Sequence, residues 1–304
     1  ISAKAFVPSG ASLGFHEALE IRDREKDFAG FGVNKAISNV NQIIAPEIVK
    51  MDLLDQKGID QKMVEMDGTE NKSNLGANAI LAVSLACAKA TSLSKNIPLY
   101  EYISQLFGQS SPTLLPTPFV NVINGGAHAK DSLDIQEFML IPSGAKSFSS
   151  GIQMISEVFF YLGEMFATGG VGDEGGYEPE NLKSTTGTDK VKEVIEMLLK
   201  AINKAGYQPG QDICLGLDIA ANHFYKDNKY QLSGGQNLTA SELLIFYQDL
   251  LNNYPVVCLE DGMAESDIEG WQLLTASLGS KIQLVGDDLF ATNPKLLSEG
   301  IKNK

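Results

Sequence analysis

Cysteine, tryptophan and histidine are scarce in this chain of 304 residues, and basic residues are fewer than acidic ones. The three cysteines, Cys87, Cys214 and Cys258, are odd in number and stand in apolar runs, which excludes a disulfide framework and predicts buried thiols in a reducing compartment. The 24 basic and 38 acidic residues give a net charge of −14. Nucleic-acid binding requires clustered Lys and Arg, so we expect no nucleic acid as a partner.

Long apolar runs are also lacking, because no uninterrupted stretch reaches the roughly 18 residues that a membrane-spanning helix needs. No basic segment followed by an apolar run and a small-residue cleavage site precedes the first motifs. These absences predict a cytoplasmic protein with no membrane partner. An acidic protein can still bind an anionic substrate if divalent metal ions neutralise some of its carboxylates.

The composition of the sequence changes near Ser110, where serine and proline cluster. Residues 1–110 favour a helical domain, with helices predicted over 33–48 and 76–90, whereas in 111–304 short apolar segments alternate with amphipathic ones. The predicted strands are 118–123, 136–141, 213–218, 256–260 and 282–287, and the predicted helices between and after them are 148–166, 190–205, 240–253, 267–278 and 294–301.

This alternation of strands and helices predicts an α/β domain with a parallel sheet covered by helices, either a (β/α) barrel or an open doubly wound sheet. A barrel of this kind closes with about eight strands. Only about five are visible, so a barrel reading implies that further strands follow Lys304.

Three of the predicted strands end on an acid, at Asp218, Glu260 and Asp287. The carboxyl ends of parallel strands share one rim, which would bring these carboxylates together. One such acid is usually a helix cap, but three in corresponding positions indicate a hard divalent cation, and ligation by oxygen alone favours Mg²⁺. Asp261 and Asp288, next to two of these acids, are interpreted as supporting or capping groups.

A second group of polar residues lies in or beside glycine-rich loops, at His128, Glu137 and Glu174. His128 could donate to an anion, and Glu137 with Glu174 could form a close acid pair in which one pKa is raised for proton transfer. Each residue alone is weak evidence, because a loop histidine is more often a surface residue. Residues 170–175 also match G-x-G-x-x-G, but a helix precedes them and Pro179 follows, which argues against a dinucleotide site.

Together these motifs resemble the enolase family over essentially the whole chain. The matching segments are PSGAS at 8–12, HEALEIRD at 16–23, DGT at 67–69, NKS at 71–73, LGANAIL at 75–81, NGGAH at 124–128, QEFM at 136–139, VGDEGG at 171–176, LD at 217–218, ED at 260–261, DDL at 287–289 and TNP at 292–294. The resemblance implies an enolase-type (β/α)8-like barrel in 111–304, incomplete with about five strands present. A smaller α+β N-terminal domain in 1–110 would precede it, and both domains would be truncated at their outer ends.

By the resemblance, Asp218, Glu260 and Asp287 would hold one Mg²⁺, and Ser12 would ligate a second Mg²⁺ that reaches the substrate phosphate. Glu174 would act as general acid, supported by Glu137. The resemblance also implies that His128, Glu137, Gln136 and Ser12 contact the substrate.

The reaction that the resemblance implies is the reversible dehydration of 2-phosphoglycerate to phosphoenolpyruvate in glycolysis and gluconeogenesis. The substrate would be a small phosphorylated carboxylate, and the full-length protein a homo-oligomer, either a dimer or an octamer. The family's base lysine has no counterpart here, so this segment alone is expected to be inactive.

Three positions depart from the family pattern, namely Leu13 in the loop of Ser12, and Asn222 with His223 after the strand of Asp218. Two alternatives stay open. One is a non-catalytic, enolase-derived metal-binding protein, if the chain ends at Lys304. The other is a related enzyme that abstracts a proton from a different carboxylate substrate.

Overall fold

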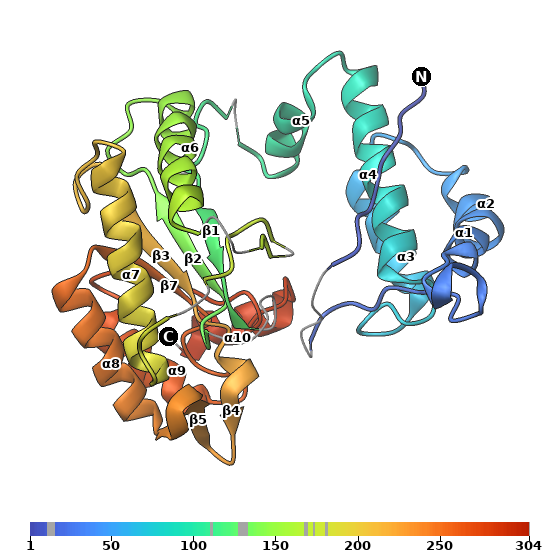
Figure 1. Ribbon diagram of the computed structural model, residues 1–304. Coiled ribbons are helices and arrows are strands. Elements are labelled where there is room, and N and C mark those ends of the chain that lie inside the picture. Colours follow the sequence, from blue (N-terminus) through green and yellow to red (C-terminus); the bar gives the residue numbers. More distant parts are fainter. Residues whose placement is uncertain are drawn as a thin grey trace. The chain divides into compact units, whose positions relative to one another are not determined.

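A computed structural model describes residues 1–10, 16–109, 112–126, 133–166, 170–172, 174–179 and 182–303. Contacts divide the chain into two compact units, Ile1–Leu114 and Leu115–Lys304, and Figure 1 gives the course of each. The residues at the predicted boundary, Ser110 and Ser111, lie outside the described ranges.

Unit 1 is helical in its described part, where no residue is in a β-strand. The prediction of a helix over 33–48 is confirmed as three consecutive segments, the middle one π-helical, and that over 76–90 is confirmed as α4. The elements are η1 (Asp27–Gly30), α1 (Asn34–Asn39), η2 (Val40–Ile44), α2 (Ala45–Ile48), α3 (Gln56–Asp67), α4 (Ala77–Ser94) and α5 (Leu99–Leu106).

Helix α3 was missed from the sequence, which predicts helices in this unit only over 33–48 and 76–90. Asp55 caps its start by accepting a hydrogen bond from the Gly58 N–H at 3.0 Å, and Gly68 ends it in the left-handed region with a φ of 71°. Only Ile59 and Met63 among its apolar residues are fully buried. The rest of the helix is too polar to give a strong periodic signal.

Helix α4 supplies part of the core of unit 1. Its length and composition alone would also suit a membrane span, a property that core helices of globular domains share. Ala79 is buried here beside Ile44, Ile59 and Met63, with Val83 packed against the same cluster.

Unit 2 is built on a five-stranded sheet in the order β1-β2-β3-β7-β8. Its strands are β1 (Val120–Asn124), β2 (Glu137–Ile141), β3 (Cys214–Asp218), β7 (Val256–Glu260) and β8 (Gln283–Val285), close to the five that were predicted. The prediction of a parallel sheet is confirmed for only part of it. The pairs β3–β7 and β7–β8 are parallel, but β2 runs antiparallel to both β1 and β3.

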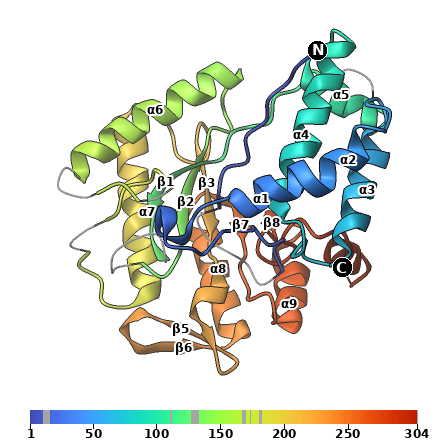
Figure 2. The same cartoon turned by 90° about the vertical axis from the view of Figure 1, so that its right-hand side faces the viewer.

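The helices of unit 2 are α6 (Phe148–Met165), α7 (Gly187–Lys204), α8 (Ala240–Asn253), α9 (Ile268–Leu278) and α10 (Pro294–Asn303), which confirms the five predicted helices. Figure 1 shows α6, α7 and α8 along one side of the sheet. A second sheet was missed, made of β4 (Tyr225–Lys226), β5 (Lys229–Leu232) and β6 (Gln236–Leu238), with η4 (Ala221–Phe224) before it and η5 (Ser233–Gly235) within it. Figure 2 shows β5 and β6 beside α8, and both strands contact this helix.

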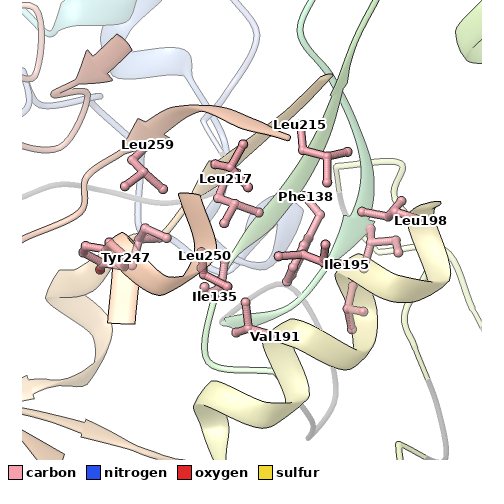
Figure 3. Packing of buried hydrophobic residues seen from close by; sticks show 14 of the residues in the cluster. Ile135, Phe138, Val191, Ile195, Leu198, Leu215, Leu217, Tyr247, Leu250 and Leu259 are labelled. Carbon is pink, nitrogen blue, oxygen red and sulfur yellow. The ribbon is translucent and has the colours of Figure 1, made fainter. Parts of the chain in front are cut away.

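One face of the five-stranded sheet packs on these helices. Phe138, Leu217 and Leu259 are fully buried there against residues of α7 and α8 such as Ile195 and Leu250 (Figure 3). Side chains alternate between the two faces of a strand, so the residues between these apolar ones project from the opposite face.

The opposite face carries the small cluster of Ile141, Cys214 and Cys258, with Val285 against it. A Cβ on Gly216 would lie 3.2 Å from Cδ1 of Ile141 and 3.6 Å from Cβ of Cys258, which places Gly216 among them. All three cysteines are free thiols, as predicted; Cys214 and Cys258 are buried, whereas Cys87 is only half-buried. Burial and the carboxylates of Glu260 and Asp218 raise the pKa of Cys258 to about 12, so this face also carries acids.

Candidate metal centre and acid pair

Four polar residues lie in one row at an edge of the five-stranded sheet. Asn124 is paired with Glu137, Glu137 with Asp218, and Asp218 with Glu260. Glu137 begins β2, at the start of the strand predicted over 136–141, and it reaches the carboxyl end of β3 because the two strands are antiparallel. Paired residues on neighbouring strands project from the same face, so the row assembles three carboxylates.

Asp218 is the most enclosed of these acids, at 7% exposure. Its Oδ2 accepts a hydrogen bond from Nε2 of Gln136 at 3.0 Å, and its Oδ1 accepts the Ala220 N–H at 3.1 Å. Burial, then the nearby charges of Glu260 and Asp261, raise the pKa of Asp218 to about 8. A carboxylate at this position therefore costs free energy unless a cation compensates it.

Glu260 and Asp261 extend the acidic group from the end of β7. Ligand atoms of Asp218, Glu260 and Asp261 all lie within 4.8 Å of one another. Burial raises the pKa of Glu260, with Asp287 as the next cause, and burial also raises the pKa of Asp261 to about 7. Asp287 is exposed just beyond β8 and is outside the group of three, although its charge acts on Glu260.

Asp261 differs from the other acids because both of its oxygens accept backbone hydrogen bonds. Oδ2 accepts the Asp288 N–H at 2.8 Å and Oδ1 accepts the Leu289 N–H at 3.4 Å. Asp261 therefore ties the loop after β7 to the loop after β8.

The residues of this centre fit a hard divalent cation. Oε1 of Gln136 is buried without a hydrogen-bond partner in the described structure, on the side chain whose Nε2 donates to Asp218. The charges of neighbouring acids raise the pKa of Asp218, Glu260 and Asp261, so a bound cation would offset their mutual repulsion. Oxygen donors of this kind suit Mg²⁺ or Ca²⁺ rather than zinc.

Glu137 and Glu174 form an acid pair beside this centre. Burial, a hydrogen bond with Glu174 and the charge of Glu174 raise the pKa of Glu137 to about 9, with Asp218 and Glu260 as further causes. At neutral pH the pair therefore holds one shared proton. Two carboxyl groups that share a proton in a partly buried site can transfer it to or from a bound molecule.

Asn124 orients Glu174 within this pair. Its Nδ2 donates to Oε2 of Glu174 at 3.1 Å, and its Oδ1 accepts the Gly176 N–H at 2.7 Å. A Cβ on Gly176 would lie 2.6 Å from Oδ1 of Asn124, and one on Gly172 would lie 2.9 Å from its Cβ. Glycine at both positions therefore lets the loop approach β1 closely.

Not every predicted site residue can be placed. Ser12 and His128, like Leu13, lie outside the described residues, whereas Gln136, Glu137, Glu174, Asp218, Glu260 and Asp287 are described. Asn124 was not predicted as a site residue, although it ends an apolar strand as Asp218 and Glu260 do. Helix α6, not a strand, precedes the G-x-G-x-x-G match.

Comparisons with known proteins agree over the whole chain. Residues 1–103 match the family model described as "Enolase, N-terminal domain", and residues 112–304 match that described as "Enolase, C-terminal TIM barrel domain". A curated relative named "Enolase", from Ehrlichia chaffeensis, is 50% identical over 308 residues, a match that covers 100% of this chain and 70% of the relative.

Proposed function

The chain belongs to the enolase family, a family of lyases, and from this premise we propose that it catalyses the Mg²⁺-dependent, reversible dehydration of 2-phosphoglycerate to phosphoenolpyruvate in glycolysis and gluconeogenesis. The observation that carries the proposal is the row of acids at the sheet edge, where Glu137, Asp218 and Glu260 are in register. It combines a proton-sharing pair with a group of carboxylates that suits a divalent cation.

In this proposal Asp218, Glu260 and Asp287 hold one Mg²⁺. Asp287 is chosen over Asp261 because both oxygens of Asp261 already accept N–H groups, whereas the exposed carboxylate of Asp287 is close enough for its charge to act on Glu260. Ser12 is proposed to ligate a second Mg²⁺ together with the substrate phosphate. Bound Mg²⁺ would supply positive charge where the substrate carboxylate gains negative charge after loss of its C2 proton.

The acid pair has its own part in the proposed reaction. Glu174 donates the shared proton to the hydroxyl group that leaves C3, and the raised pKa of Glu137, about 9, keeps the pair protonated before this step. Asn124 holds Glu174 in place for this step. Gln136 and His128 are proposed to bind the substrate beside the pair.

The base is proposed to be a lysine that residues 1–304 do not include. The chain spans 70% of the Ehrlichia relative, so a related protein has sequence outside the matched part.

The decisive test uses the purified protein that carries this chain. Formation of phosphoenolpyruvate from 2-phosphoglycerate is followed by its ultraviolet absorbance, with Mg²⁺ and with a chelator. Turnover that requires Mg²⁺ and is lost in Asp218→Ala supports the proposal. Mg²⁺ binding without turnover favours the non-catalytic, metal-binding alternative, and turnover of another carboxylate alone favours a different enzyme of this kind.

Two further parts of the proposal rest on family membership. We expect a cytoplasmic protein that forms a homo-oligomer, a dimer or an octamer. Light scattering coupled to size-exclusion chromatography measures the mass in solution, and a monomer at micromolar concentration would contradict the second expectation.

A further inference from the structure

Asn222 occupies the first loop after the strand that ends in Asp218, and it is one of the departures from the family pattern. It lies in η4 and is half-buried. Its Oδ1 accepts the Glu265 N–H at 2.7 Å and its Nδ2 donates to Oδ2 of Asp288 at 3.3 Å. One side chain after β3 thus reaches both the loop after β7 and the loop after β8.

Asp288 is held at two points as a result. Its N–H donates to Asp261, and its carboxylate accepts from Asn222. Asp288 directly follows Asp287, so fixing both its backbone and its side chain restricts where the carboxylate of Asp287 can lie. The charge of Asp288 also acts on Asp218, Glu260 and Asp261.

The loop after β7 is fixed from other elements as well. Tyr247 on α8 donates to the Gly262 carbonyl at 2.8 Å, and the hydroxyl of Tyr230 on β5 accepts the Ala264 N–H at 3.1 Å. These hydrogen bonds hold the loop after β7 in place, and Asn222 is hydrogen-bonded to this loop. His223, the neighbouring residue that also differs from the family pattern, is exposed and is not proposed to support this loop.

We propose that Asn222 is a positioning residue of the metal centre, which fixes Asp288, and through it Asp287, relative to Asp218 and Glu260. An amide suits this task because it carries an acceptor and a donor on separate atoms, one for a backbone N–H and one for a carboxylate. The inference rests on the proposed function insofar as Asp218, Glu260 and Asp287 hold Mg²⁺. Groups that orient the ligands of a metal commonly change its affinity by about 10- to 100-fold.

The test measures Mg²⁺ binding to the purified protein by calorimetry, without substrate. Asn222→Ala removes both contacts, and Asn222→Asp keeps an acceptor for Glu265 but repels Asp288. We expect the Kd for Mg²⁺ to rise about tenfold or more in both variants. A weakening in N222D would run against the attraction of its added negative charge for a cation, so it would report lost positioning.

Asn253→Ala is the matched control. Nδ2 of Asn253 also donates to an aspartate, at 2.9 Å from Oδ1 of Asp249, but this contact is exposed on α8. We expect N253A to bind Mg²⁺ as the wild type does. A rise in Kd for N253A equal to that for N222A would overturn the inference, because the effect would then not belong to this site.

A double-mutant cycle with Asp288→Ala tests the route of the effect. If Asn222 acts through Asp288, N222A changes the Kd little in the D288A background. An equal change in both backgrounds, or unchanged binding in N222A, overturns the inference while leaving the proposed function intact. A wild-type protein that bound no Mg²⁺ would overturn both.

Discussion

Asn124 and Glu174 are joined by a hydrogen bond of 3.1 Å between Nδ2 and Oε2, although 50 positions separate them in the sequence. Asn124 is fully buried at the end of β1, whereas Glu174 lies in a glycine-rich loop. The buried amide therefore fixes a loop carboxylate beside Glu137, the residue opposite Asn124 on the next strand.

Replacement of Asn124 by alanine should uncouple the acid pair. The Gly176 N–H loses its acceptor, and Glu174 loses the donor that orients it. We expect the protein to lose about 1–3 kcal/mol of stability, the usual cost of a buried group left unpaired, and kcat for 2-phosphoglycerate to fall about tenfold or more.

Asn121→Ala provides the control on the same strand. Neither amide atom of Asn121 has a hydrogen-bond partner in the described structure. Kinetics at saturating substrate and thermal unfolding should therefore show little change in N121A. Equal losses of kcat in N121A and N124A would contradict the role given to Asn124.

Gly176→Ala should disturb the same loop by a steric route. The added Cβ would lie 2.6 Å from Oδ1 of Asn124 and 2.8 Å from the Ile123 nitrogen, so the loop must move away from β1. We expect kcat to fall as in N124A. Among the described residues, a Cβ at Gly170 would meet nothing nearer than Oε2 of Glu178 at 3.9 Å, so G170A should keep most activity. Comparable activity of the two variants would argue against the close approach of this loop to β1.

Asp287 and Asp261 should respond differently to loss of their charge. We expect Asp287→Ala to weaken Mg²⁺ binding in calorimetry by about tenfold or more while the metal-free melting temperature stays unchanged, because its carboxylate is exposed. Asp261→Asn should lower the metal-free melting temperature, because an amide nitrogen cannot accept the N–H of Asp288 or Leu289. If D261N abolished Mg²⁺ binding without loss of stability and D287A bound normally, the ligand would be Asp261.

Asp67 should make unit 1 sensitive to acid. It is 2% exposed, and burial alone would raise its pKa, but hydrogen bonds from Leu75, Thr69 and Asn74 outweigh burial and lower it. A lowered pKa in the folded state means that this stability is present above the unfolded value of about 4 and is lost as the pH falls through the folded value. We therefore expect the protection of residues 67–79 from hydrogen exchange, measured relative to the intrinsic exchange rate at each pH, to fall below about pH 4.

Asp67→Asn should reproduce this loosening at neutral pH. One amide oxygen cannot replace the two oxygens that accept from Thr69 on one side and from Asn74 and Leu75 on the other. Asp52→Asn is the control, because Asp52 is exposed and its Oδ1 accepts a hydrogen bond from the Leu54 N–H at 3.0 Å, an acceptor that one amide oxygen can replace. Equal exchange rates in D67N and the wild type would contradict the prediction.

The strands of the five-stranded sheet could be predicted because each is centred on a short apolar run. Their direction could not be predicted, since a hydrophobic pattern reads the same for parallel and antiparallel pairing. The error matters for Glu137, which begins its strand and yet lies beside Asp218. Helix α3 was missed for a different reason, because its caps rather than its few buried residues define it.

Local patterns of residues are enough to identify the acids at the strand ends, the glycines of the 172–176 loop and the enolase resemblance. Which of these residues meet depends on the folded chain. The links from Asn124 to Glu174 and from Asn222 to Asp288 join residues that are 50 and 66 positions apart. Such links depend on the pairing and register of strands, and hydrogen bonds form only between atoms that the folded backbone has brought within about 3 Å of each other.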